Sequence, residues 1–207
     1  AGTFSDGKLN TLVKDPYGRN HEVLKRFVEA GAPEEILYQQ KPHLGTDVLI
    51  GIVEKMRHDI ETMGGSFRFR AKVTDLHFEK GALKEIQVND GEIIPAQVCV
   101  LAVGHSARDT FEMLYRRGLY LEPKAFAVGL RIEHPQSMIN MDLYGEEENE
   151  FLGAAAYKVT HKCENGRGVY SFCMCPGGYV VNASSEPGRL AVNGMSYQAR
   201  DSRNANS

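Results

Sequence analysis

The sequence has no tryptophan, only four cysteines, no long hydrophobic run and no excess of charge of one sign. Four cysteines in 207 residues are too few for a disulfide scaffold, which favours a reducing cytoplasm as the location. No apolar run approaches the roughly 20 residues of a membrane-spanning helix, and we expect no export signal. A net charge of −3 offers no electrostatic footprint, so we expect neither a nucleic-acid partner nor an anionic membrane.

The composition is that of an ordinary globular protein, with 42% hydrophobic and 25% charged residues. The length is sufficient to bury a hydrophobic core without staples. The 21 glycines exceed the usual share of roughly 7% and are scattered along the chain. They predict many turns and several places where backbone is closely approached.

Three segments carry apolar residues at helical spacing. The predicted helices span about 21–30, 46–63 and 106–117. Thr46 is the expected cap of the second helix, and Gly31 follows the first. Ser106 and Asp109 match the spacing of a capping box at the start of the third helix.

The spacing changes to two between the second and third helices, which predicts strands. Residues 67–73 alternate, and a slip of phase near Asp75 predicts a bulge. Two turns then predict a small meander through 83–88 and 92–94. The run 98–103 is apolar on both faces, as in a buried, parallel central strand.

The second half of the chain reads as short antiparallel strands separated by glycines. The expected strands are 125–132, 156–160, 169–174, 179–182 and 190–192. The overall fold class is therefore α/β, or α+β. Because the buried parallel strand lacks enough neighbours and the final residues show no terminating element, we expect a piece of a longer protein.

The turn after the apolar run is the first candidate binding site, because ligands in open α/β sheets bind where strands end and helices begin. Gly104 would allow close approach of a ligand, although a plain strand-to-helix connection is an equal alternative. The only G-x-G, at 166–168, precedes a strand and is interpreted as a hairpin turn. A dinucleotide fingerprint is therefore absent, and any pyrophosphate site would lie outside this sequence.

Cys173 and Cys175 are the most unusual local pair. On an extended strand they point to the same face. Two small buried residues at a strand end are favoured over a redox dithiol or a metal site. A metal would need two more ligands, such as Cys163 or His161, and the spacing matches no zinc site.

Arg131, Glu133 and His134 place three ionisable groups at the end of another expected strand. Arg131 and Glu133 share a face and are expected to pair with one another or with a neighbouring strand. His134 and His105 are candidates for acid–base catalysis, because imidazole titrates near neutral pH. A structural or exposed role is the commoner one for a lone histidine.

Several longer sequence strings are more specific than these residue spacings. Residues 2–9 (GTFSDGKL), 41–47 (KPHLGTD), 101–109 (LAVGHSARD) and 170–179 together with 193–197 resemble uncharacterised bacterial FAD-dependent dehydrogenases. The resemblance extends over essentially the whole chain. That family is similar to the two-domain flavoproteins of the glutathione-reductase type.

The resemblance implies part of an FAD-binding, Rossmann-like domain with a small β-meander at 1–118. It implies an antiparallel substrate domain at 119–193 and a segment returning to the flavin at 194–207. The intact protein would use FAD, with NAD(P) as a candidate electron donor, to move hydride or electrons to or from an unknown small molecule. The isolated segment would be inactive. A macromolecule- or RNA-binding module on the same scaffold is the alternative.

The resemblance also implies site residues. The family's second FAD motif usually closes on Thr-Gly or Ser-Gly, and here Val103 stands in the first place, so only the backbone approach at Gly104 carries over. Expected on the FAD side are Gly2, Thr3, Ser5, Asp6, His43, Gly45, Gly104, Ser106 and Gly178. Expected on the flavin or substrate face, as candidate catalytic residues, are His105, Arg131, Cys173 and Cys175.

Overall fold

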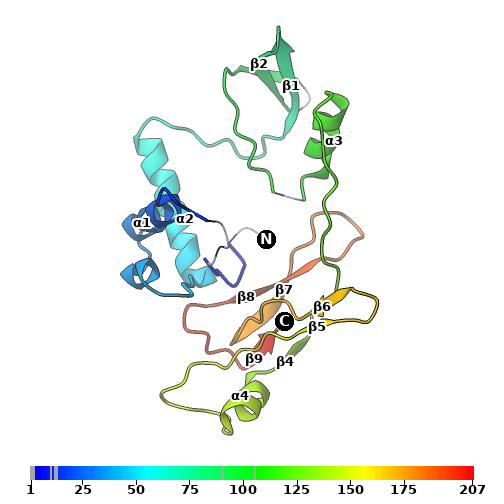
Figure 1. Ribbon diagram of the computed structural model, residues 1–207. Coiled ribbons are helices and arrows are strands. Elements are labelled where there is room, and N and C mark those ends of the chain that lie inside the picture. Colours follow the sequence, from blue (N-terminus) through cyan, green and yellow to red (C-terminus); the bar gives the residue numbers. More distant parts are fainter. Residues whose placement is uncertain (1–2, 10, 12–13, 90, 105) are drawn as a thin grey trace. The chain divides into compact units, whose positions relative to one another are not determined.

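The computed structural model describes residues 3–9, 11, 14–89, 91–104 and 106–207. The chain forms two compact units, which are described separately (Figure 1). Unit 1 consists of Ala1–Gly65 and Gly129–Ser207, and unit 2 of Ser66–Val128. Unit 1 therefore joins the two ends of the sequence.

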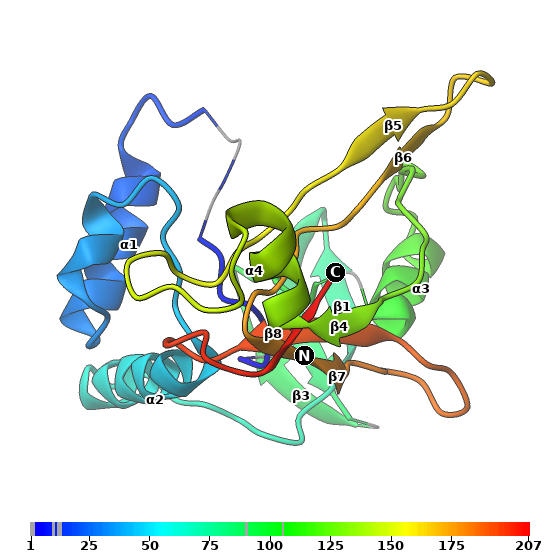
Figure 2. The ribbon, with the colours of Figure 1, turned by 90° about the horizontal axis from the view of Figure 1, so that it is seen from below.

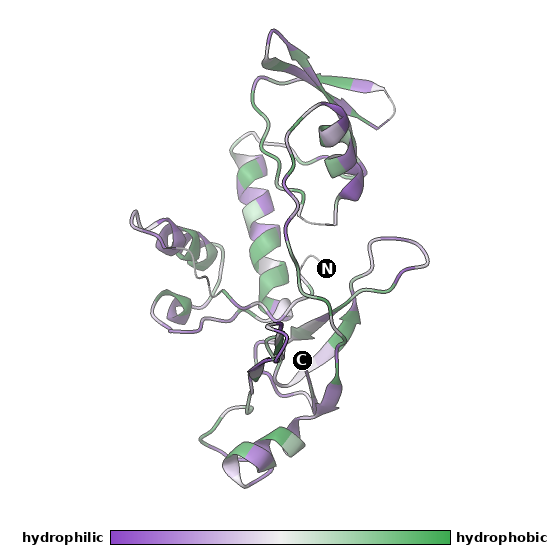
Figure 3. Cartoon of the chain, turned by 45° about the vertical axis from the view of Figure 1, so that its right-hand side comes forward, coloured by the Kyte–Doolittle hydropathy of each residue, from purple (hydrophilic) through white to green (hydrophobic). Residues whose placement is uncertain are grey.

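The first part of unit 1 is helical. It contains α1 (Arg19–Glu29), the short 3-10 helix η1 (Glu34–Leu37) and α2 (Thr46–Thr62). Apolar and polar residues alternate along α2 at helical spacing (Figure 3), and its apolar residues pack into a small core. The buried members of that core are Ala30, Ala32, Ile36, Leu44 and Ile52. Both helices predicted for this part are confirmed, whereas η1 was not predicted.

The second part of unit 1 consists of short antiparallel strand pairs and one helix (Figures 1 and 2). β4 (Glu133–Pro135) pairs with β9 (Asn204–Asn206), β5 (Thr160–Lys162) with β6 (Gly168–Tyr170), and β7 (Gly178–Asn182) with β8 (Val192–Ser196). Helix α4 (Gln136–Tyr144) follows β4. The core here is formed by Ile139, Ala155, Met174 and Ala205. The antiparallel character and the hairpin turn at 166–168 are confirmed.

Unit 2 is a three-stranded meander with one helix. β1 (Val73–Glu79), β2 (Ala82–Val88) and β3 (Glu92–Pro95) pair in that order, and α3 (Arg108–Arg116) contacts β1. The register shifts between Val73 and Asp75, so the predicted bulge is confirmed. The predicted meander is confirmed as well.

Several predicted strands form only in part or not at all. Residues 67–72, 125–132, 156–159, 171–174 and 190–191 lie outside the strands, and so does the run 98–103 that was expected to be a buried central strand. Val98 and Val100 are 83% and 84% exposed. An apolar strand needs hydrogen-bonded neighbours and covering helices, and every strand pair in the described ranges is antiparallel and lies elsewhere.

Two predicted helix caps are wrong. Gly45 precedes α2, and the Thr46 hydroxyl instead donates to the carbonyl oxygens of Thr3 (3.2 Å) and Ser5 (3.1 Å). Ala107 precedes α3 with no side-chain cap, because Asp109 pairs with Lys72 at 2.6 Å. In both cases a contact distant in sequence takes the polar group away from the helix end.

The described ranges thus combine helices with small antiparallel sheets, and they contain no parallel sheet of the kind found in a Rossmann-like domain. The boundaries at 118 and 193 stay predictions, because compactness alone identifies neither a cofactor domain nor a substrate domain. Among the residues described, no helix is long and apolar enough to cross a membrane.

Candidate functional site

A hollow of about 400 Å³ lies within unit 1. Its surface is mainly apolar, with a few charged and polar groups. We call it the unit 1 hollow; it is lined by Ser5, Asp6, Gly7, Lys8, Leu9, Phe27, Leu49, Arg131, Phe172, Cys173, Cys175, Asn193 and Gly194. The N-terminal segment, helices α1 and α2, strand β8 and the irregular stretches around 131 and 172–175 build it together.

Asp6 forms the ion pairs on one side of the unit 1 hollow. Its carboxylate pairs with Lys8 Nζ at 2.6 Å and with Arg200 Nη2 at 3.3 Å. It also accepts a hydrogen bond from Ser196 Oγ at 2.5 Å. Lys8 Nζ donates in addition to the carbonyl oxygen of Met174. These contacts fix the N-terminal segment to residues more than 160 positions away.

A serine, a histidine and an aspartate meet here in an order unlike that of a catalytic triad. His43 Nε2 lies 3.2 Å from Ser196 Oγ, and Ser196 gives its only proton to Asp6. The serine therefore stands between the other two, and His43 Nε2–H donates to it. Burial lowers the pKa of His43 to about 4, with the nearby Arg200 charge adding to the effect. His43 is thus neutral near pH 7, and the serine has no free base to activate it.

The backbone of the N-terminal segment is tightly packed against the start of α2. Gly7 has φ 62°, and a β-carbon there would overlap the carbonyl oxygen of Leu44. Leu44 N donates to Gly7 O at 3.0 Å. Gly45 N donates to Gln198 Oε1 at 2.7 Å, so the C-terminal segment closes this corner. Glycine at position 7 is required by both its conformation and its neighbour.

Arg131 borders the hollow from the opposite half of unit 1. Its Nη1 donates to Asn206 Oδ1 and lies 4.0 Å from Cys175 Sγ. Asn206 is held on the chain segment that pairs with both β4 and Cys175. A β-carbon at Gly194 would lie 2.5 Å from Arg131 Nη1 and 2.5 Å from Cys175 Sγ, and closer still to Asn206 Oδ1. Glycine at 194 therefore leaves room for the arginine.

Cys173 and Cys175 both line the hollow, as expected of two residues on one face, yet they differ in environment. Cys173 is exposed and Cys175 is buried, and both are free thiols. Burial raises the pKa of the Cys175 thiol to about 11, and the Asp6 charge adds to this. A thiol that stays protonated is a poor nucleophile, which disfavours a redox dithiol at neutral pH. No three His, Cys, Asp or Glu side chains in the described ranges gather as a metal site.

The structure brings only part of the predicted site together. Ser5, Asp6, Arg131, Cys173 and Cys175 line the unit 1 hollow. Four other predicted residues belong to unit 1 but do not line the hollow: Thr3, His43, Gly45 and Gly178. Gly104 and Ser106 belong to unit 2, and Gly2 and His105 lie outside the described residues. None of these placements tests the expected cofactor contacts, which stay predictions.

Glu133 and His134, the ionisable neighbours of Arg131 in sequence, do not line the unit 1 hollow. Glu133 accepts hydrogen bonds from Val180 N at 3.1 Å and Asn204 Nδ2 at 2.6 Å. Of the two expected pairings, the one with neighbouring strands is therefore confirmed, and the one between Arg131 and Glu133 is not formed. His134 Nε2 lies 3.0 Å from the hydroxyl of Tyr157, outside the hollow lining, as in a structural histidine.

Sequence reasoning missed several residues of this site: Lys8, Gly194, Ser196, Arg200 and Asn206. Their partners lie on other elements, so no local spacing reveals them. The strings that carried the family resemblance contain Lys8, Gly194 and Ser196, and that was the one available signal. Arg200, with φ 52°, and Asn206 had none.

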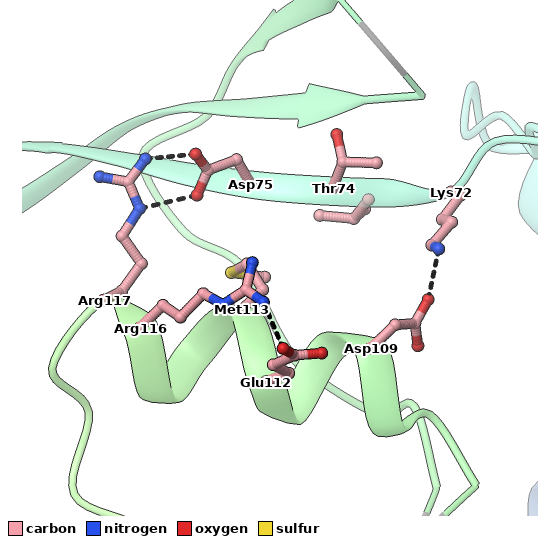
Figure 4. A pocket seen from close by; sticks show the side chains of 9 residues that line it. Lys72, Thr74, Asp75, Asp109, Glu112, Met113, Arg116 and Arg117 are labelled. Atoms are coloured by element: carbon pink, nitrogen blue, oxygen red, sulfur yellow. Dashed lines mark hydrogen bonds and ion pairs between the residues drawn. The ribbon is translucent and has the colours of Figure 1, made fainter.

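Unit 2 contains a second hollow, of about 460 Å³, between β1 and α3 (Figure 4). Its cations each face a carboxylate: Lys72 pairs with Asp109, Arg116 with Glu112, and Arg117 with Asp75. The Arg117 guanidinium lowers the pKa of Asp75. Because the charges are balanced within the hollow, we regard the unit 1 hollow as the stronger candidate site.

Comparison with known proteins relates the C-terminal part of this chain to an FAD-dependent family. Residues 125–207 match the family model described as FAD-dependent protein, C-terminal domain-like. An uncharacterized protein of Clostridium beijerinckii is 53% identical over 209 residues, covering 100% of this chain and 39% of that protein. The chain thus spans about two fifths of the length of the curated relative. The matched region supplies Arg131, both cysteines and Gly194 to the unit 1 hollow.

Proposed function

We propose that this chain is a section of an FAD-dependent oxidoreductase, a dehydrogenase that passes hydride or electrons between a reductant and a small-molecule substrate. The observation that carries the proposal is the match of residues 125–207 to an FAD-dependent family, because that region forms one side of the unit 1 hollow. NAD(P)H is the proposed reductant. A cytoplasmic location agrees with four free cysteines.

The residues of the hollow suit the substrate side of a flavin site. Phe27 and Phe172 with Leu9 and Leu49 offer apolar walls, and Arg131 offers a cation, for a small molecule that would lie beside the flavin ring. The sequence lacks the G-x-G-x-x-G turn that holds a pyrophosphate. The chain is therefore proposed to supply the ring and substrate side of the site.

In this proposal FAD, when bound, supplies the hydride chemistry, and the protein supplies orientation and electrostatics. Asp6 with its two cations and Ser196 fixes the N-terminal wall. Cys175 stays a neutral thiol at the floor and takes no part in electron transfer. Without a pyrophosphate site of its own, the isolated chain should show no turnover.

The test uses the protein at the full length of its relative, loaded with FAD. NADH or NADPH is added without oxygen, and the visible absorbance of oxidised flavin is followed. The proposal expects one of the nucleotides to bleach that absorbance within the time of a catalytic assay. The Cys173→Ser variant should bleach at the same rate. A flavin that neither nucleotide reduces, but that dithionite does reduce, would contradict the assignment as an NAD(P)H-using dehydrogenase.

A further inference from the structure

Arg131 is a partly buried cation with no carboxylate opposite it. Its Nη1 donates to a neutral amide, Asn206 Oδ1, and no ion pair joins it to an acid in the described part of the chain. The carboxylate nearest in the hollow lining, Asp6, already pairs with Lys8 and Arg200. The unit 1 hollow therefore carries more positive than negative charge, unlike the balanced hollow of unit 2.

A cation without a counter-charge beside a mainly apolar surface suits a ligand that has both an anionic group and an apolar body. Burying a charge without a counter-charge is costly, so an anionic group that reaches Arg131 would be stabilised there. Guanidinium presents five donors in a flat fork, and within the described part of the chain only Nη1 of Arg131 has a partner. The walls around it, Phe27 and Leu49 among them, favour an apolar body on the same ligand.

Two features indicate that this arrangement is built rather than incidental. A β-carbon at position 194 would clash with Arg131, Cys175 and Asn206 at once, so only glycine fits there. Asn206, fully buried, turns its oxygen to Arg131 and leaves its own Nδ2 without a partner. The guanidinium is thus positioned by a neutral acceptor, which fixes its direction and leaves its charge for a ligand.

We propose that the unit 1 hollow binds a small organic acid with an apolar body, its carboxylate on Arg131 and its body against the aromatic and aliphatic walls. A volume of about 400 Å³ lies in the range of small-molecule sites. The inference rests on the proposed function only in making this acid the substrate; binding of the acid does not depend on it.

The test is calorimetric titration of the protein at the full length of its relative with phenylacetate, with its neutral amide phenylacetamide, and with inorganic phosphate. Phenylacetate should bind at least about tenfold more tightly than the amide, because a charge-assisted pair is lost in the amide. Phosphate, which lacks the apolar body, should not displace it. Arg131→Gln should remove the preference for the acid, and Arg131→Lys should keep part of it. Arg167→Gln, an equal change of charge in the exposed β5–β6 turn, is the matched control and should leave it unchanged.

Equal affinity for acid and amide, displacement by phosphate, or an unchanged preference in Arg131→Gln would overturn the proposal. So would the absence of saturable phenylacetate binding at millimolar concentration. Circular dichroism of each variant shows whether it is folded, and the comparison of acid with amide needs no variant at all. Repeating the titration with and without FAD separates the two proposals: acid binding without any flavin binding rejects the flavoprotein function alone, and flavin binding without acid binding rejects this inference alone.

Discussion

Gly194 lies where three side chains of the unit 1 hollow meet. Gly194→Ala places a β-carbon against Arg131, Cys175 and Asn206, so the neighbours must shift. We expect a loss of about 1–3 kcal/mol in the free energy of unfolding, as for other overpacked sites. Gly51→Ala is the control, because nothing lies within 4 Å of its β-carbon in α2 and alanine should stabilise the helix by about 0.5–1 kcal/mol. Urea denaturation measures both, and an unaffected Gly194→Ala variant would show that the hollow is looser than described.

His43 makes the free energy of unfolding depend on pH. Its pKa is about 4 in the folded chain and about 6.5 when exposed, so between these values the unfolded chain binds the proton and the folded chain does not. The free energy of unfolding is therefore independent of His43 protonation above pH 6.5, and it decreases as the pH falls from 6.5 to 4. Denaturation at a series of pH values should show this loss, and His43→Gln should show less of it. A histidine NMR titration with a midpoint near 6.5 for His43 would contradict the buried, neutral assignment.

The cysteines should differ in reactivity although only one residue separates two of them. Cys173 and Cys99 are exposed, whereas Cys175 is buried and its pKa is raised to about 11. Iodoacetamide at neutral pH should therefore label the first two and spare Cys175, because the thiolate is the reacting form. Peptide mapping by mass spectrometry reads the sites, and unfolded protein, in which all four should react, is the control. Rapid labelling of native Cys175 would revive the redox dithiol.

At the scale of elements, β1 and α3 are joined by the pair between Asp75 and Arg117. The guanidinium donates through Nε at 2.7 Å and through Nη2, and it lowers the pKa of Asp75. Arg117→Gln should raise the Asp75 pKa toward its ordinary value with little effect on stability, because the ion pair is exposed to solvent. Carboxyl NMR titration provides the measurement. Arg116→Gln, which removes the neighbouring pair with Glu112, should leave Asp75 unchanged; an equal rise in both variants would mean that general charge, not this contact, sets the pKa.

Elements with local signals were predicted well, and those that depend on distant partners were not. The helical spacing in α2 and the change of phase at Asp75 depend on residues that are neighbours in sequence, and both predictions are confirmed. The run 98–103 has the composition of a buried strand, but a strand needs partners, and the described residues provide none for it. Helix α4 was missed because its apolar residues show little one-sided spacing. The two cap predictions failed because distant residues claimed Thr46 and Asp109.

At the scale of the whole molecule, the candidate site could be predicted only in part. Arg131 and the two cysteines were found as unusual local strings, and Ser5 and Asp6 through the family resemblance. Asp6, Ser196 and Arg200 form one network across 190 positions or more of sequence, and no spacing rule reaches that far. The chain's two ends meet in unit 1, which explains why the site emerged only from the structure.

The central claim is that this chain forms part of an FAD site, and the visible absorption spectrum of the purified protein at its relative's full length tests it most directly. The account predicts the absorbance bands of bound flavin, with FAD identified by mass spectrometry after the protein is denatured and close to one FAD per chain. A folded protein that stays colourless after incubation with FAD and gel filtration would contradict it.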